Sequence, residues 1–188
     1  YNGKQRQISF RSKYFSPDIN ETGTEILAVS LLPNGQSSLH RINAQTGSLV
    51  SKLPNAANYF FTQTKYINDR QAISAVRNPQ GQMALVRVNL ADGLTEPLTT
   101  FSYNVLGYPF IKGDTVYFTA MQNDADKLFA LRLSDKKLFR ITDNINGMYA
   151  PTANDQGQVL ASAFTADGYR LARFLWTKIV RIMMHMRS

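Results

Sequence analysis

The sequence repeats at an interval of 46 residues, and this interval limits the possible folds more than any other feature of the chain. A polar turn that begins with Asn and ends at Gly47 recurs at Gly93. An earlier turn centred on Gly35 recurs at the same interval around Gly81. Two separate turn signals at one interval predict structural units of roughly 45 residues, seen about three and a half times.

Each unit contains up to four segments with the composition of β-strands, separated by turns rich in Gly, Asn, Asp and Pro. The expected strands of the first two units are residues 14–18, 25–30, 38–43 and 48–53, then 60–66, 71–77, 84–89 and 94–99. Those of the last two are residues 108–111, 115–121, 128–133 and 137–142, then 149–152, 158–164 and 169–174, with no fourth strand.

Successive four-stranded antiparallel units of this length are typical of β-propeller blades. We therefore predict an all-β fold, a propeller or propeller segment of about four blades, within residues 1–174. The predicted repeat units are residues 14–55, 59–100, 104–144 and 148–174.

Residues 6–10 align with residues 138–142, the last strand of the third unit, and two interpretations follow. The segment could pair with residues 169–174 and close a four-bladed ring. Alternatively, it is the last strand of a preceding blade, and the chain, which begins with Tyr, is a fragment of a larger ring of about six to eight blades. We favour the second, because such blades usually occur in larger rings.

The net charge of +8 is concentrated at the two ends of the chain. Four bases lie in residues 1–16 and three in residues 178–187, which leaves 14 bases against 13 acids for the repeats. A nucleic-acid surface needs a basic stripe, commonly with interleaved aromatic side chains, and the repeats carry none. We therefore expect no nucleic-acid partner.

Residues 175–188 depart from the repeat pattern and contain half of the six methionines. Lys178, Arg181 and His185 have a helical spacing that would place them on one face. This tail would be either a basic amphipathic helix on a membrane surface or a segment foreign to the fold. No stretch reaches the roughly 18 apolar residues of a membrane-spanning helix.

The run Ser16-Pro17-Asp18, followed by a turn at Gly23 and a strand, resembles the blade signature of TolB-type propellers. The resemblance covers residues 6–174 in spacing and is clear in the first unit. The aligned positions are residues 64–66, 108–110 and 150–152, of which only the last two sets keep the proline. The family implies a periplasmic or cell-surface location and the binding of a protein or a glycan. Similar propellers precede the catalytic domain of prolyl-oligopeptidase-type serine peptidases, which gives the alternative of an accessory propeller.

The sequence offers little for catalysis. It has no cysteine and two histidines, His40 in an alternating strand and His185 in the tail, and no nucleophile-elbow, phosphate-loop or zinc motif. Asn123, Asp124 and Asp126 could offer oxygen ligands to calcium, but a hairpin turn explains them better. We therefore predict no enzyme, catalytic residue, metal or cofactor.

Aromatic residues gather around the starts of the first strands of the units. They would either line a binding face at the mouth of the ring, for a peptide or glycan, or pack between blades. The candidate binding face consists of Tyr14, Tyr59, Phe61, Tyr103, Tyr108 and Tyr149. The sequence leaves the partner and the oligomeric state open.

Overall fold

The computed structural model describes residues 3–143 and 147–175, in which every regular element is a β-strand. Four antiparallel sheets, called blades 1 to 4 here, follow one another along the chain. Blade 1 contains β1 (Tyr14–Ile19), β2 (Glu25–Leu31), β3 (Ser37–Asn43) and β4 (Leu49–Lys52). Blade 2 contains β5 (Phe60–Asn68), β6 (Gln71–Arg77), β7 (Met83–Asn89) and β8 (Thr95–Pro97). Blade 3 contains β9 (Leu106–Lys112), β10 (Thr115–Gln122), β11 (Ala125–Arg132) and β12 (Leu138–Arg140). Blade 4 contains β13 (Met148–Ala153), β14 (Gln158–Thr165) and β15 (Gly168–Leu175).

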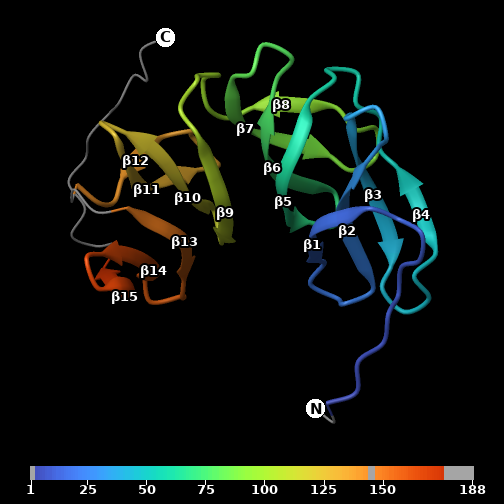
Figure 1. Cartoon of the computed structure of the whole chain (residues 1–188), viewed down its shortest axis with the longest axis horizontal. Coiled ribbons are helices and arrows are strands. Elements are labelled where there is room, and N and C mark those ends of the chain that lie inside the picture. The colour runs from blue at the N-terminus through green and yellow to red at the C-terminus, as the bar shows by residue number, and fades with distance from the viewer. Residues whose placement is uncertain (1–2, 144–146, 176–188) are drawn as a thin grey trace.

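The blades are arranged as an open arc, with the first strand of each blade on its concave side (Figure 1). β1 packs beside β5, β5 beside β9, and β9 beside β13. The predicted all-β propeller architecture is thereby confirmed. No helix, and hence none able to cross a membrane, occurs in residues 3–143 and 147–175. The predicted basic helix beyond residue 175 lies outside the described residues.

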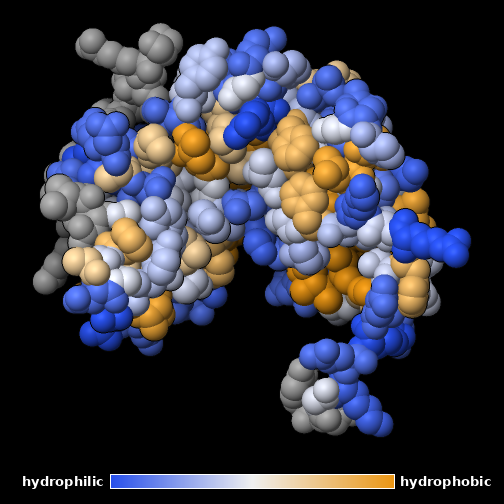
Figure 2. All heavy atoms as spheres, in the orientation of Figure 1, coloured by the Kyte–Doolittle hydropathy of each residue, from blue (hydrophilic) through white to orange (hydrophobic). Residues whose placement is uncertain are grey.

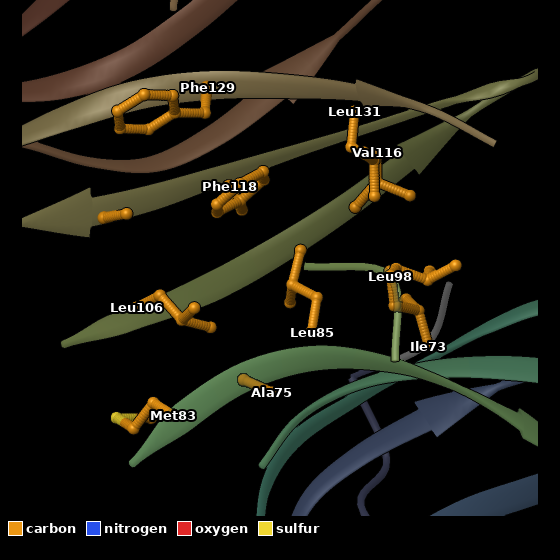
Figure 3. Close-up of a cluster of buried hydrophobic side chains, with 11 residues drawn as sticks. Ile73, Ala75, Met83, Leu85, Leu98, Leu106, Val116, Phe118, Phe129 and Leu131 are labelled. Atoms are coloured by element: carbon orange, nitrogen blue, oxygen red, sulfur yellow. The ribbon is translucent and has the colours of Figure 1, made fainter. Parts of the chain in front are cut away.

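The two central strands of blade 2, β6 and β7, are mostly apolar because both of their faces are buried. Alternate residues of β6 point to opposite faces, so Ala72 and Val76 pack on blade 1 while Ile73 and Ala75 pack on blade 3. Figure 3 shows Leu85 and Ile73 of blade 2 opposite Phe118 and other side chains of blade 3. This packing explains why residues 71–77 form a nearly continuous apolar run instead of a half-polar one.

The turn expected at residues 123–126 is shorter than the sequence suggested. β10 ends at Gln122 and β11 begins at Ala125, which leaves Asn123 and Asp124 as the two turn residues. Both have positive φ, 50° and 59°, as a tight hairpin turn requires. Asp126 therefore belongs to a strand, and in the described ranges no group of three or more His, Cys, Asp or Glu side chains is placed to hold a metal ion.

The N-terminal segment runs beside blade 1 and forms no strand there. Arg6 donates a hydrogen bond to the Gln45 carbonyl, and Ile8 lies against Gly47. Pro54 lies against Gly93 in the same way, at the same 46-residue offset. In the described residues, the order of blade 4 is β13-β14-β15, so the pairing of residues 6–10 with residues 169–174 is not formed. The segment instead occupies the place that the end of a preceding blade would take.

Candidate functional site

Each inner strand has an irregularity near its start. The strand pairing skips residues 16–17 in β1, residue 62 in β5, residues 108–109 in β9 and residues 150–151 in β13. By the cross-strand pairing, Asp18, which faces Leu27, corresponds to Lys65, which faces Ile73, so the alignment of Ser16-Pro17-Asp18 with residues 64–66 is displaced by one residue. Such bulges turn side chains out of the regular alternation. The bulges recur near the start of the inner strand in every blade.

The bulge of blade 3 turns Tyr108 outward. Tyr108 has a φ of 54° and an exposed fraction of 47%, while Pro109 beside it is buried. A left-handed conformation in a non-glycine residue costs about 1–2 kcal/mol, and it is seen most often where function or packing requires it. Here it directs a large aromatic ring to the surface.

Blade 2 holds this bulge in place through Gln63. The Gln63 side-chain oxygen accepts a hydrogen bond from the Tyr108 backbone N–H. A β-carbon on Gly107 would stand 2.7 Å from the same oxygen, so the glycine leaves room for the contact. The Tyr108 backbone is thus fixed from two blades, and the ring is presented from a rigid support.

A cavity of about 300 Å³ opens at this place, between the inner-strand starts of blades 2, 3 and 4. We call it the tyrosine pocket and define it by five of its lining residues, Gln63, Arg77, Tyr108, Asp126 and Tyr149. The Tyr108 and Tyr149 rings meet edge to face, with their centroids 6.4 Å apart and their planes at 81°. Two aromatic rings, a guanidinium and a carboxylate therefore share one hollow.

Asp126 and Tyr149 form the polar centre of the pocket. The Tyr149 hydroxyl donates a hydrogen bond to the Asp126 carboxylate, which, together with partial burial, raises the pKa of Tyr149 to about 12. The guanidinium of Arg77 approaches the Met83 sulfur at 4.0 Å. In residues 3–143 and 147–175, no carboxylate forms an ion pair with Arg77. Arg77 is therefore a cation available to a ligand.

The structure brings only part of the predicted aromatic face together. Tyr108 and Tyr149 meet in the tyrosine pocket. Tyr103 is 75% exposed but does not line the pocket. Phe61 is buried in the core between blades 1 and 2, where Tyr59 packs on Phe101 with ring centroids 5.5 Å apart.

Tyr14 lies in blade 1 and contacts His40 instead of the pocket. Its hydroxyl is 2.9 Å from His40 Nδ1, and Ser38 Oγ is 3.1 Å from His40 Nε2. His40 is 5% exposed, and burial lowers its pKa, with Lys52 adding to the effect. A histidine enclosed in this way orders the blade 1 sheet and has little access to a substrate.

The sequence did not point to Gln63 or Arg77, and it placed Asp126 in a hairpin turn, with calcium binding as the less favoured alternative. Gln63 reaches the pocket because of the bulge at residue 62, and Arg77 because β6 ends beside the start of β5. The 46-residue interval could have pointed to Gln63, since it follows Pro17 of the blade signature by 46 residues.

Replacing Asp126 with Asn should return the pKa of Tyr149 from about 12 toward its ordinary value of 10.0, because the charge that favours the protonated phenol is removed. In the native chain the hydrogen bond between Tyr149 and Asp126 stabilises the fold below pH 10, because the folded state holds the Tyr149 proton more tightly than the unfolded state. This stabilisation disappears as the pH rises toward about 12. NMR titration of the native and variant chains with labelled tyrosine would measure the pKa of Tyr149 in each. Tyr117, whose pKa is raised by burial, is the control and should not move.

No protein-family model matches the sequence, and no curated protein matches it either. Several solved structures, in contrast, are similar to this chain. Putative TolB from Agrobacterium tumefaciens superposes with a TM-score of 0.76 at 12% identity, over 96% of this chain and 65% of that chain. TolB from Acinetobacter baumannii superposes with a TM-score of 0.70 at 14% identity, over 92% of this chain and 43% of that chain. A puromycin-hydrolyzing peptidase from Mycobacterium tuberculosis superposes with a TM-score of 0.70 at 11% identity, over 88% of this chain and 28% of that chain. This chain spans less than two thirds of the length of each of these proteins. At such identities the likeness concerns the fold, and it shows that these sheets are blades of a TolB-like β-propeller.

Proposed function

We propose that the chain is a non-catalytic binding module of a bacterial envelope protein and that it binds a segment of a protein partner in the tyrosine pocket. The observation that carries this proposal is an Arg77 without a carboxylate partner in the described part of the chain, next to two partly exposed tyrosines. The likeness to TolB of two bacteria supports the envelope location.

The side chains of the pocket suit a peptide. The Arg77 guanidinium can pair with a carboxylate of the partner, and the Gln63 amide N–H groups can donate to a backbone carbonyl. The rings of Tyr108 and Tyr149 offer an apolar surface with few rotatable bonds, which is the chemistry found at the centre of protein interfaces. A bound glycan without acidic groups would use the rings as well, but it would leave Arg77 without an anionic partner.

The test uses random peptides displayed on phage and selected against the immobilised chain. The Kd of the selected peptide is then measured by calorimetry with the native chain and with the variants Tyr108→Ala and Arg77→Ala. We expect each variant to weaken binding by at least about 10-fold, because each removes a central contact. Tyr103→Ala, which removes an exposed tyrosine outside the pocket, should bind as the native chain does.

Selection of peptides that bind equally well to all four chains would place the binding surface elsewhere. Binding of soluble peptidoglycan oligosaccharides, with no peptide selected, would replace the protein partner by a glycan.

A second candidate function is that of an accessory propeller in a larger serine peptidase, where the same pocket would hold a segment of the substrate. The superposition on the puromycin-hydrolyzing peptidase favours it. The coding sequence beside this region decides between them, since a peptidase would encode a Gly-x-Ser-x-Gly motif in a neighbouring domain.

A further inference from the structure

The tyrosine pocket contains two opposite charges that are not paired with each other. Arg77 is the last residue of β6 in blade 2, and Asp126 lies near the start of β11 in blade 3. Both side chains line the same cavity of about 300 Å³. Among the ion pairs formed within residues 3–143 and 147–175, none includes either of them. The pocket therefore presents both a cation and an anion to whatever enters it.

Each of the two charges is drawn to a different wall of the pocket. The Arg77 guanidinium lies 4.0 Å from the sulfur of Met83, its cross-strand neighbour in blade 2. The Asp126 carboxylate accepts a hydrogen bond from the Tyr149 hydroxyl of blade 4. Opposite charges in so small a hollow would gain energy by meeting, and these contacts keep them apart. A ligand that carries both charges can therefore pair with both.

The two threonine hydroxyls of the pocket are already used by the fold. The Thr62 hydroxyl donates to the Ala75 carbonyl at 2.9 Å, and the Thr119 hydroxyl donates to the Met148 carbonyl at 3.2 Å. These contacts reduce what the pocket can offer to an uncharged ligand that is rich in hydroxyl groups. Recognition of a polar ligand in this pocket therefore depends mainly on its charged groups.

Two tyrosine rings make the Asp126 side of the pocket suitable for a basic side chain. The planes of Tyr108 and Tyr149 stand at 81° to each other and form two walls of a corner. The face of an aromatic ring attracts a lysine ammonium or an arginine guanidinium. A carboxylate has about four acceptor positions, and the Tyr149 hydroxyl takes one of them at Asp126. A basic side chain can thus lie against the rings while it donates to Asp126.

Arg77 makes the other side of the pocket suitable for an acidic side chain, because a guanidinium can donate two parallel hydrogen bonds to one carboxylate. In an extended segment, residues two positions apart point to the same side and lie about 7 Å from each other, which is also about the width of a cavity of about 300 Å³. Figure 2 shows the molecule hollowed on the concave side of the arc, so an extended chain can approach the inner strands.

We propose that the partner segment carries a basic and an acidic side chain two positions apart, the basic one bound by Asp126 and the tyrosine rings and the acidic one bound by Arg77. This specificity rests on the proposed function, since it requires that the pocket binds a peptide. A segment with acidic residues alone would leave Asp126 without a cation, and one with basic residues alone would leave Arg77 without an anion.

The peptides selected on phage against the native chain give the first test. We expect most of them to contain Lys or Arg and Asp or Glu, in either order, with one residue between them. A selected peptide is then synthesised in two altered forms, one with its basic residue replaced by methionine and one with its acidic residue replaced by glutamine. Calorimetry measures the Kd of each form with the native chain and with the variants Asp126→Asn and Arg77→Met.

The loss of a charge on one side should matter only while its partner on the other side is present. Replacing the basic residue of the peptide should raise the Kd at least about 10-fold with the native chain and less than about 2-fold with Asp126→Asn. Replacing the acidic residue should have the same pattern with Arg77→Met. A merely structural role of Asp126 or Arg77 would weaken all peptide forms alike.

Asp124→Asn and Arg70→Met are the matched controls, since both side chains are exposed and neither lines the pocket. Each control should keep every Kd within about 2-fold of its native value. A charge exchange adds a gain of binding that misfolding cannot imitate. Arg77→Glu should lose the selected peptide and bind the form whose acidic residue is replaced by lysine. Failure of this exchange in a chain that melts like the native one would contradict the role of Arg77.

The outcomes separate this proposal from the function on which it rests. Peptides that depend on Tyr108 but carry no basic residue, or whose basic residue is not coupled to Asp126, would overturn the charge specificity and leave the peptide-binding function standing. A selection that yields no peptide for the native chain would overturn both.

Discussion

Replacing Gly93 with alanine is expected to lower the free energy of unfolding by about 3 kcal/mol or more. Gly93 has a φ of +75°, and a β-carbon there would stand 2.4 Å from the Pro54 carbonyl oxygen and 3.0 Å from the Pro54 nitrogen. The Pro54 backbone is held on both sides, because Leu53 donates to the Leu39 carbonyl and Asn55 donates to the Ser37 carbonyl. The clash therefore cannot be relieved by a small shift.

Urea denaturation would measure the change, with Gly35→Ala as the matched control. Gly35 has a φ of +80°, but nothing lies within 4 Å of its β-carbon position. Gly35→Ala should therefore lower the free energy of unfolding by about 1 kcal/mol, the cost of the backbone strain alone. Equal losses for the two variants would mean that blade 1 and blade 2 do not approach each other closely at Gly93.

The equivalent turns at Gly47 and Gly93 show how much of the fold can be predicted from the sequence alone. The interval between them relates blades 1 and 2, and the strands expected there overlap the observed strands, because turn residues repeat with the blades. The sequence placed the equivalent turn of blade 3 at residues 134–136, where Lys136, with a φ of 54°, takes the position of the glycine. Turn geometry can persist when its preferred residue is lost, so the repeat fades in sequence before it fades in structure.

The candidate site was predicted less well, for a physical reason. Tyr108 and Tyr149 were found because aromatic residues stand out at strand starts. Gln63 and Arg77 enter the pocket only through the bulge in β5 and the packing of β6 beside it. Such placement depends on residues of neighbouring strands, and no pattern within one strand encodes it. Phe61 shows the converse, since the same position near a strand start can face the core.

A second large effect is expected at the contact of blade 1 with blade 2, where three hydrogen bonds join Glu25 to Arg41 and Tyr66. Its carboxylate accepts hydrogen bonds of 2.6 and 2.9 Å from the Arg41 guanidinium and one of 2.8 Å from the Tyr66 hydroxyl. Burial, followed by these contacts with Glu25, raises the pKa of Tyr66. The Glu25 side chain is only 16% exposed, so water cannot readily replace it.

Glu25→Ala should therefore cost about 3 kcal/mol of stability, because it leaves a partly buried guanidinium without its carboxylate. Tyr66→Phe, which removes one hydrogen bond and keeps the ring, should cost about 1 kcal/mol. Urea denaturation of both variants, of Arg41→Ala, and of Glu25→Ala combined with Arg41→Ala would separate the ion pair from the rest of the network. If the pair is strongly coupled, the double variant should be far more stable than the sum of the single losses implies. Additive losses would show that solvent screens the pair as it does on an open surface.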